Sequence, residues 1–193
     1  ALRTGGVVVS KEAGYITEKD MTPRKVVYEH KSKPLKDIVI PTNQHSINLY
    51  AEMMYRYLAT RISTPCTLHN SETFMRNYWQ NRGVSLRATC IKDGCGLAPQ
   101  DAVSPDAFVQ LLSYMAGSSE RDAFYESLPV SGESGTLKML LKGTELEGRV
   151  HAKSGTIFGT RNYAGYIETK KGDTWAFAVM VNSSNAKARQ IQR

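Results

Sequence analysis

The sequence lacks any run of apolar residues close to the roughly 18–20 that a membrane-spanning helix needs. Cysteine is scarce: Cys66, Cys90 and Cys95 do not form the paired C-x-x-C spacing of a zinc site, and the histidines do not cluster with them along the chain. Three cysteines allow at most one disulfide, so cysteine usage does not decide the compartment. We therefore expect no membrane-spanning helix, no metal and no other cofactor.

The first residues do not predict a leader sequence. The N-terminal residues ALRTGG lack the charged and apolar regions of a signal peptide, and the first residue is not methionine. We expect from this a processed or truncated chain. With 193 residues, 41% of them hydrophobic and 22% charged, the sequence has the composition of a soluble globular protein and can bury a core, which excludes a disordered chain.

The basic residues show no concentration of the kind that a nucleic-acid site has. There are 25 lysine and arginine residues against 18 acidic ones, a net charge of +7, but they are scattered along the chain. The sequence has no signature of an RRM, KH or helix-turn-helix domain. The sequence therefore favours a solvated basic face and no nucleic-acid partner. An extracytoplasmic protein near an anionic wall polymer would show the same excess of basic over acidic residues.

Residues 1–45 show no helical period, and they predict turns and short strands at 5–10 and 24–30. From Ser46 onward apolar residues recur at helical spacing, and capping residues mark further helices. The expected helices cover residues 46–58, 70–83, 104–117, 120–127 and 135–141.

The C-terminal third has the alternation and turn residues of an antiparallel sheet. The expected strands cover residues 86–91, 150–157, 163–169 and 174–181, and the turn at 170–173 predicts a hairpin between the last two. Helices followed by an antiparallel meander predict an α+β fold, in which helices pack on an antiparallel sheet.

Ser46 and Asn48 form an S-x-N motif at the point where the first helix is expected to begin. Their side chains can therefore point from the start of the helix into a cleft. Taken alone, Ser46 would be interpreted as the N-cap of that helix.

A K-[ST]-G motif and a threonine, at Lys153, Ser154, Gly155 and Thr156, lie on the strand expected at 150–157. Because side chains alternate along a strand, the first and third of these residues are expected on one face and the second and fourth on the other. Glycine in this position leaves room for another backbone or a ligand to approach the strand. His151 is expected to be a surface residue of the same strand rather than a base.

The two motifs, in this order, resemble the second and third motifs of the serine penicillin-binding proteins and β-lactamases. Around them, residues 36–56, 92–108 and 148–169 resemble successive blocks of the D-alanyl-D-alanine carboxypeptidase/endopeptidase family, the class C low-molecular-mass penicillin-binding proteins. The resemblance implies that residues 36–193 are the C-terminal part of a penicillin-binding, β-lactamase-like transpeptidase domain. It also implies that residues 1–35 are the remnant of a preceding insertion domain or layer.

The family's S-x-x-K nucleophile motif is missing before Ser46. The only literal match begins at Ser184, after the last expected strand, and we interpret it as chance. Residues 93–97 read D-G-C-G-L where the family has D-G-S-G-L, so Cys95 stands in the place of a hydroxyl residue. We expect Cys90 and Cys95 to be structural or to form one local disulfide.

The resemblance implies roles for the motif residues in acyl transfer. The implied catalytic residues are Ser46, Asn48 and Lys153, and the implied substrate-binding residues are Ser154, Gly155 and Thr156. The serine of S-x-N would relay a proton to the leaving amine, the asparagine would bind the substrate peptide, and the lysine would supply positive charge. The two hydroxyls on the strand would bind the substrate's carboxylate, and the strand's backbone would pair with the peptide.

The activity implied is that of a serine-type D-alanyl-D-alanine carboxypeptidase/endopeptidase of peptidoglycan, located outside the cytoplasm in the bacterial periplasm or cell envelope. Its partners would be stem peptides ending in D-Ala-D-Ala, β-lactams and the missing N-terminal half of the same protein. We expect the parent protein to be an enzyme and the 193-residue chain alone to be inactive. The alternative is a whole gene product that has lost the nucleophile, a non-enzymatic peptidoglycan-binding or scaffold module.

Overall fold

The structure is a computed structural model of the chain, and it describes residues 4, 6, 8, 10, 25, 26, 28–62, 66–157 and 159–184. The chain divides into two compact units, Ala1–Ser32 and Lys33–Arg193. The interpretation of residues 1–35 as the remnant of an insertion stays a prediction.

The described residues of the first unit lie in turns and irregular backbone. The strands expected at 5–10 and 24–30 are not found at the positions that the structure describes, and the rest of these two segments lies outside the described residues. Val8, Val26 and Tyr28 are exposed. The physical reason is that β-branched and aromatic residues form a strand only where another strand or a packed face stabilises it.

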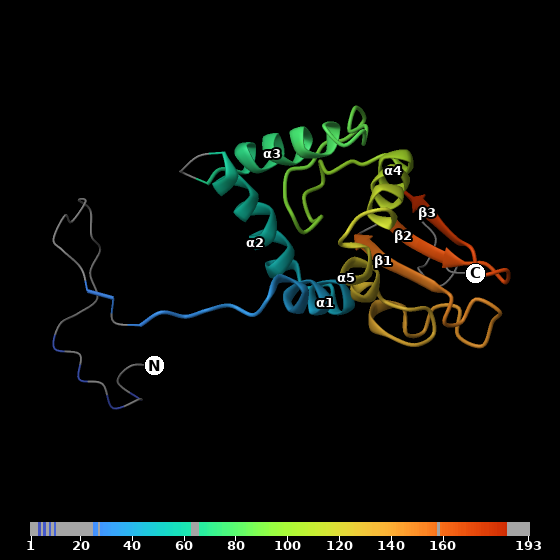
Figure 1. The fold of residues 1–193 in the computed structure, drawn as a ribbon, viewed down its shortest axis with the longest axis horizontal. Coiled ribbons are helices and arrows are strands. Elements are labelled where there is room, and N and C mark those ends of the chain that lie inside the picture. Colours follow the sequence, from blue (N-terminus) through green and yellow to red (C-terminus); the bar gives the residue numbers. More distant parts are fainter. Residues whose placement is uncertain are drawn as a thin grey trace. The chain divides into compact units, whose positions relative to one another are not determined.

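The second unit packs helices on a three-stranded antiparallel sheet, as the predicted α+β fold requires (Figure 1). Its elements are α1 (Leu35–His45), α2 (Asn48–Leu58), η1 (Ala59–Arg61), α3 (Leu68–Gln80), α4 (Pro105–Ala116), α5 (Arg121–Ser127), η2 (Gly135–Leu137), β1 (Val150–Ile157), β2 (Thr160–Glu168) and β3 (Thr174–Val181). The strands follow one another in the order β1-β2-β3, so β1 is an edge strand. None of the helices in the described part of the chain has both the length and the apolarity needed to cross a membrane.

Several element boundaries agree with the sequence-based expectation, and others do not. β1 and β3 have the expected bounds, and Ser104 caps α4 by accepting a hydrogen bond from the Ala107 N–H. The strand expected at 86–91 is reduced to a single bridge between Cys90 and Ala102. Only residues 135–137 of the helix expected at 135–141 are helical, as one 3-10 turn.

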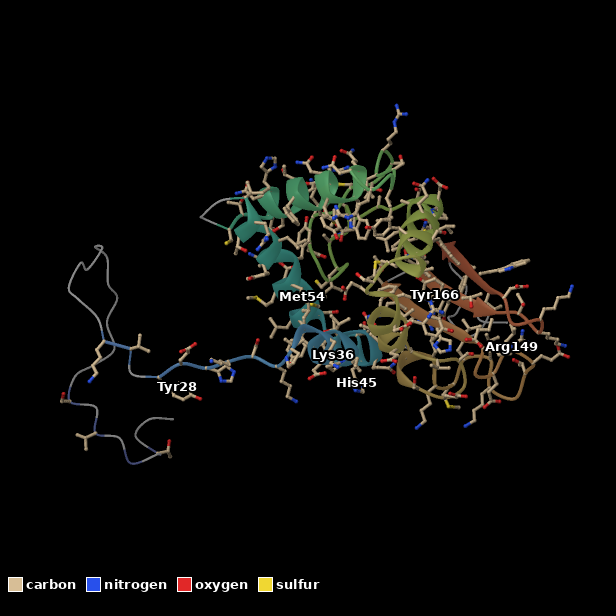
Figure 2. The ribbon with its side chains drawn as sticks, in the orientation of Figure 1. Tyr28, Lys36, His45, Met54, Arg149 and Tyr166 are labelled. Carbon is tan, nitrogen blue, oxygen red and sulfur yellow. The ribbon has the colours of Figure 1, made fainter. Side chains whose placement is uncertain are left out.

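Helix α1 lies in a segment for which the sequence predicts strands and turns. Pro34 precedes it, where proline is tolerated, but Pro41 lies inside it and argues against a helix. Tertiary contacts stabilise it: the side chain of Asn43 donates to Ser127 Oγ at 2.8 Å, and that of Gln44 donates to the Leu128 carbonyl at 2.9 Å. The C-terminal end of α1, marked by His45 in Figure 2, is thereby held against the end of α5.

The two faces of the sheet are covered by different elements. On one face, Leu112 of α4 packs on Tyr166 of β2, whose hydroxyl donates to the Leu112 carbonyl at 2.8 Å. On the other face, Leu137 of η2 packs on Val150 and Ala152 of β1. These contacts hold β1, the strand that bears the K-S-G-T residues, at a definite position between the two layers.

Candidate active site

Ser46 lies in a two-residue connection between α1 and α2, not at the N-cap of a helix. It ends α1 in the left-handed conformation (φ 53°, ψ 54°), and its N–H donates to the Thr42 carbonyl. Ile47 occupies the N-cap position of α2, without a side-chain cap. The interpretation of Ser46 as an N-cap is therefore wrong, because its hydroxyl is used elsewhere.

The partner of the Ser46 hydroxyl is Lys153, 107 residues further along the chain. Lys153 Nζ donates to Ser46 Oγ at 2.9 Å and to the Ser154 carbonyl at 2.6 Å. Burial lowers the pKa of Lys153 below its ordinary value, because desolvation disfavours the charged ammonium. The fold thus brings the S-x-N and K-S-G motifs together around one partly buried cation.

Ser154 points to the other face of β1, as strand alternation predicts. Its Oγ donates to Thr136 Oγ1 at 2.8 Å. Thr136 belongs to η2, which approaches α1 so closely that a Cβ on Gly135 would lie 2.5 Å from Gln44 Oε1. Thr136 is a candidate site residue that sequence reasoning missed, since no motif joins it to residues 18 positions away.

Thr156 is exposed, and its hydroxyl accepts a hydrogen bond from the guanidinium of Arg161 on β2. Asn48 begins α2 and is exposed, two residues after Ser46. Gly155 is exposed as well, and a methyl group added there would lie 3.9 Å from the nearest atom of the chain, an ordinary contact. Internal packing therefore leaves the outer side of Gly155 open.

The outer edge of β1 presents backbone groups that can pair with an extended peptide. The Ala152 N–H donates to the Pro129 carbonyl, and the Val150 carbonyl accepts from the Ser131 N–H, so even-numbered residues point to this edge. No described strand pairs with the edge beyond Ala152. The N–H and C=O groups of Ser154 and Thr156 therefore face outward, beside the two motifs.

Residues 93–97 form a loop anchored on α2. The Asp93 carboxylate accepts hydrogen bonds from the N–H groups of the four residues 95–98, and the Gly94 N–H donates to Glu52 Oε2 at 2.7 Å. Burial raises the pKa of Asp93, but the four backbone hydrogen bonds outweigh it and hold the pKa below its ordinary value. The loop therefore stabilises the helix that follows Ser46.

Cys95 lies in this loop and is a poor candidate for a nucleophile. Burial raises the pKa of its thiol, and the nearby carboxylates of Asp93 and Glu52 raise it further. Cys66, Cys90 and Cys95 are free thiols, so the local disulfide allowed as one expectation for the last two is not formed.

Among the described residues, Glu52, Asp93 and Cys95 are the group whose ligand atoms come close enough, within 4.8 Å of one another, to surround a cation. The Asp93 oxygens accept from residues 95–98, and the Glu52 oxygens accept from Arg56 Nε and the Gly94 N–H. Because all four carboxylate oxygens already have donors, the cluster is better explained as the anchor of the loop.

The lowered pKa of Asp93 predicts a pH-dependent contribution to stability. A carboxyl group whose pKa is lower in the folded state stabilises that state fully above its unfolded pKa, about 3.9, and loses the contribution as the pH falls towards the folded pKa. We expect Asp93→Asn to lower the free energy of unfolding by on the order of 1–3 kcal/mol at pH 7 and by less below pH 4. Urea denaturation at several pH values measures this, and an equal loss at pH 7 and pH 3 would contradict it.

His151 is not the surface residue that the sequence suggests. It is half-buried and stacks on Tyr125 of α5 with ring centroids 4.2 Å apart. Burial lowers its pKa, although the carboxylates of Glu168 and Glu133 oppose the effect. The stacking helps to hold β1 against α5, two residues before Lys153.

Solved structures with the same fold include penicillin-binding enzymes. The crystal structure of penicillin binding protein 4 (dacB) from Haemophilus influenzae, complexed with a β-lactam, superposes with a TM-score of 0.77 at 25% identity, covering 85% of this chain and 39% of that chain. The TLA-3 extended-spectrum β-lactamase superposes with a TM-score of 0.60 at 23% identity, covering 81% of this chain and 58% of that chain, and shows likeness of fold alone. The predicted transpeptidase-like fold is confirmed.

Proteins with similar sequences include D-alanyl-D-alanine carboxypeptidases. A D-alanyl-D-alanine carboxypeptidase from Actinomadura sp. (strain R39) is 29% identical over 194 residues, covering 97% of this chain and 36% of the relative. The D-alanyl-D-alanine carboxypeptidase DacB of Haemophilus influenzae is 26% identical over 161 residues, covering 82% of this chain and 34% of the relative. The chain thus spans about a third of the length of these relatives.

The resemblance inferred from the motifs extends to the whole chain. Residues 1–193 match the D-Ala-D-Ala carboxypeptidase 3 (S13) family. Since the match leaves out no residue, the chain belongs to this family.

Proposed function

We propose that this chain is the C-terminal part of the catalytic domain of a serine-type D-alanyl-D-alanine carboxypeptidase/endopeptidase, with its nucleophile in an upstream S-x-x-K motif. The observation that carries the proposal is the 2.9 Å hydrogen bond from Lys153 Nζ to Ser46 Oγ, which joins the two motifs. Membership in the S13 family and the names of the relatives support it. The absence of S-x-x-K before Ser46 and the share of the relatives that the chain spans support the upstream position of the nucleophile.

The proposed reaction is acyl transfer in two steps. The nucleophilic serine attacks the carbonyl of the D-Ala-D-Ala peptide bond, forms an acyl-enzyme ester and releases the terminal D-alanine with a proton on its amine. Water then hydrolyses the ester and regenerates the serine. This chain contributes to proton transfer and to substrate binding, because it contains the second and third motifs and not the first.

Ser46 and Lys153 act together in the proton transfer. Because Lys153 donates to Ser46 Oγ, the hydroxyl proton of Ser46 is free to pass to the leaving amine. The ammonium stabilises the negative charge that develops on Oγ as this proton leaves, and the proton that the nucleophilic serine loses in its attack then replaces it on Ser46. The hydrogen bond from Lys153 to the Ser154 carbonyl keeps the ammonium in place.

The substrate binds along the outer edge of β1. Its extended peptide pairs with the outward-facing backbone of Ser154 and Thr156, in the manner of an added strand. Gly155 permits this close approach, and Asn48 offers its amide to the peptide from the first turn of α2. The Thr156 hydroxyl donates to the terminal carboxylate, and the Ser154 hydroxyl does so by turning its proton from Thr136 Oγ1 to the substrate. A β-lactam places its own carboxylate there.

Helix α2 has an exposed apolar face that another segment of the parent protein could cover. Leu49, Met53 and Tyr57 are 66%, 56% and 66% exposed and lie four residues apart, so they form one apolar stripe just after Ser46. We propose that the segment bearing the nucleophile covers this stripe. Since the substrate is peptidoglycan, the proposed location of the parent protein is the periplasm or cell envelope.

A labelled-penicillin gel tests the proposal. We expect the 193-residue chain to take no covalent label, and a protein that includes the upstream S-x-x-K segment to be labelled at that serine. The nucleophilic serine and its base work together, so a chain that lacks the serine keeps only residual catalysis. The control is the longer protein with its S-x-x-K serine replaced by alanine, which should also remain unlabelled.

Two results would contradict the proposal. A labelled band from the 193-residue chain, mapped to Ser46 or Ser184, would show that the nucleophile lies within it. A reading frame that begins near residue 1 with no upstream S-x-x-K would instead favour the non-enzymatic peptidoglycan-binding module.

A further inference from the structure

Gln44 lies in the last turn of α1, two residues before Ser46, and its side chain reaches the segment where α5 ends. Its Nε2 donates to the Leu128 carbonyl at 2.9 Å and to the Ser127 carbonyl at 3.3 Å. These two acceptor residues are buried, with exposed fractions of 2% and 0%. Carbonyl groups of buried residues depend on a protein donor, so the amide of Gln44 fixes the end of α1 on this segment.

The segment that accepts these hydrogen bonds also pairs with β1. The Ala152 N–H donates to the Pro129 carbonyl at 2.9 Å, and the Ser131 N–H donates to the Val150 carbonyl at 2.9 Å. The side chain of Pro129 is fully buried, so this part of the segment has little room to move. Because Lys153 directly follows Ala152, the same contacts fix the point on β1 from which the lysine side chain extends.

Three hydrogen bonds thus close a ring that contains the proposed proton-transfer pair, and short stretches of backbone complete it. They are the bonds from Lys153 Nζ to Ser46 Oγ, from Gln44 Nε2 to the Leu128 carbonyl, and from the Ala152 N–H to the Pro129 carbonyl. The bond from Gln44 is the one that a substitution can remove without changing the pair itself. A closed ring of short links limits how far Ser46 and Lys153 can move apart.

The position of Ser46 depends on such support. Its backbone is in the left-handed region (φ 53°), which a residue other than glycine adopts when its surroundings impose it, and its side chain is exposed. Gln44 is held from a second side, since a Cβ on Gly135 would lie 2.5 Å from Gln44 Oε1 and 2.7 Å from its carbonyl oxygen. The residue that fixes the turn is therefore Gln44, and Ser46 follows it.

We propose that Gln44 is a positioning residue whose amide keeps the Ser46 hydroxyl within hydrogen-bond distance of Lys153 during acylation. The inference rests on the proposed function and adds to it a residue that acts through Ser46. Passage of the Ser46 proton to the leaving nitrogen requires close placement of the donor oxygen. Without the amide, the end of α1 moves relative to β1, and the ammonium no longer assists this transfer.

The test measures how fast labelled penicillin acylates the full-length protein, the one that includes the nucleophile segment, at a series of penicillin concentrations. We expect Gln44→Met, which keeps the length of the side chain and removes its donors, to lower the limiting rate by about ten- to a hundredfold and to change the half-saturating concentration by less than about threefold. Gln44→Glu should lose at least as much, because its carboxylate would face two carbonyl oxygens. A merely structural role would reduce the amount of protein that is labelled and leave the rate constant of the folded fraction unchanged.

The matched control is Asn43→Ala. Asn43 also joins α1 to the end of α5, by a 2.8 Å hydrogen bond to Ser127 Oγ, but it lies outside the ring. This variant should lose thermal stability and keep its limiting rate nearly unchanged.

Two results would overturn the inference and leave the proposed function standing. One is a normal limiting rate for Gln44→Met, and the other is an equal loss of rate in Asn43→Ala and Gln44→Met at equal thermal stability. If the unsubstituted full-length protein takes no label, the proposed function is overturned and this inference with it.

Discussion

Lys153→Ala is expected to abolish acylation of the full-length protein by labelled penicillin, with a fall in the acylation rate of about a hundredfold or more. The variant loses the ammonium that lies 2.9 Å from Ser46 Oγ, and with it the charge that assists proton transfer. The fold should persist, because removing a partly buried charge relieves its desolvation cost.

The measurement is the time course of labelling on a gel, beside a thermal denaturation curve of the same sample. Lys171→Ala, in the exposed turn between β2 and β3, is the matched control and should be labelled at the normal rate. Rapid labelling of a well-folded Lys153→Ala protein would show that the hydrogen bond to Ser46 has no part in acylation.

Gly94→Ala is expected to cause a large loss of stability through a single added methyl group. An alanine Cβ at this position would lie 2.3 Å from Tyr55 Cβ and 2.7 Å from the Ala51 carbonyl oxygen, both on α2. Neither atom is the end of a flexible side chain, so the loop has to move away from the helix. Overpacking of this kind costs about 1–3 kcal/mol, and the free energy of unfolding should fall by at least that amount.

The control for this variant is Gly117→Ala at the end of α4. Gly117 has a φ of −98°, and a Cβ there would meet its nearest atom, the Tyr114 carbonyl oxygen, at 3.8 Å. It should therefore unfold with nearly unchanged stability. Equal denaturation midpoints for Gly94→Ala and the unsubstituted chain would mean that the loop is not anchored on α2 as described.

The sequence predicts well those elements whose ends are specified by residues close to them in the chain. Ser104 and Pro105 mark the start of α4 because a hydroxyl cap and a proline at the first helical position act within one turn. β1 and β3 have the predicted bounds because alternation and turn residues are read from neighbours in the sequence. The S-x-N and K-S-G-T motifs are local in the same sense, and together with the blocks at 36–56, 92–108 and 148–169 they indicated the family.

The elements that the sequence misses depend on contacts between distant segments. Helix α1 contains Pro41, and its stability comes from side chains that reach the end of α5 about 84 residues away. Residues 86–91 have strand-like composition, but only Cys90 finds a partner. In both cases tertiary packing overrides local preference.

The sequence by itself determined which residue types are available: a serine and an asparagine two positions apart, a lysine before a serine, a glycine and a threonine, and no upstream S-x-x-K. Only the tertiary structure decided that Ser46 closes α1 in a left-handed turn and accepts from Lys153, 107 residues away. It also decided that Arg161 meets Thr156 across β1 and β2. The physical reason is that a hydrogen bond forms only between atoms about 3 Å apart in space. The distance between two residues along the chain predicts their distance in space only within one turn or one hairpin.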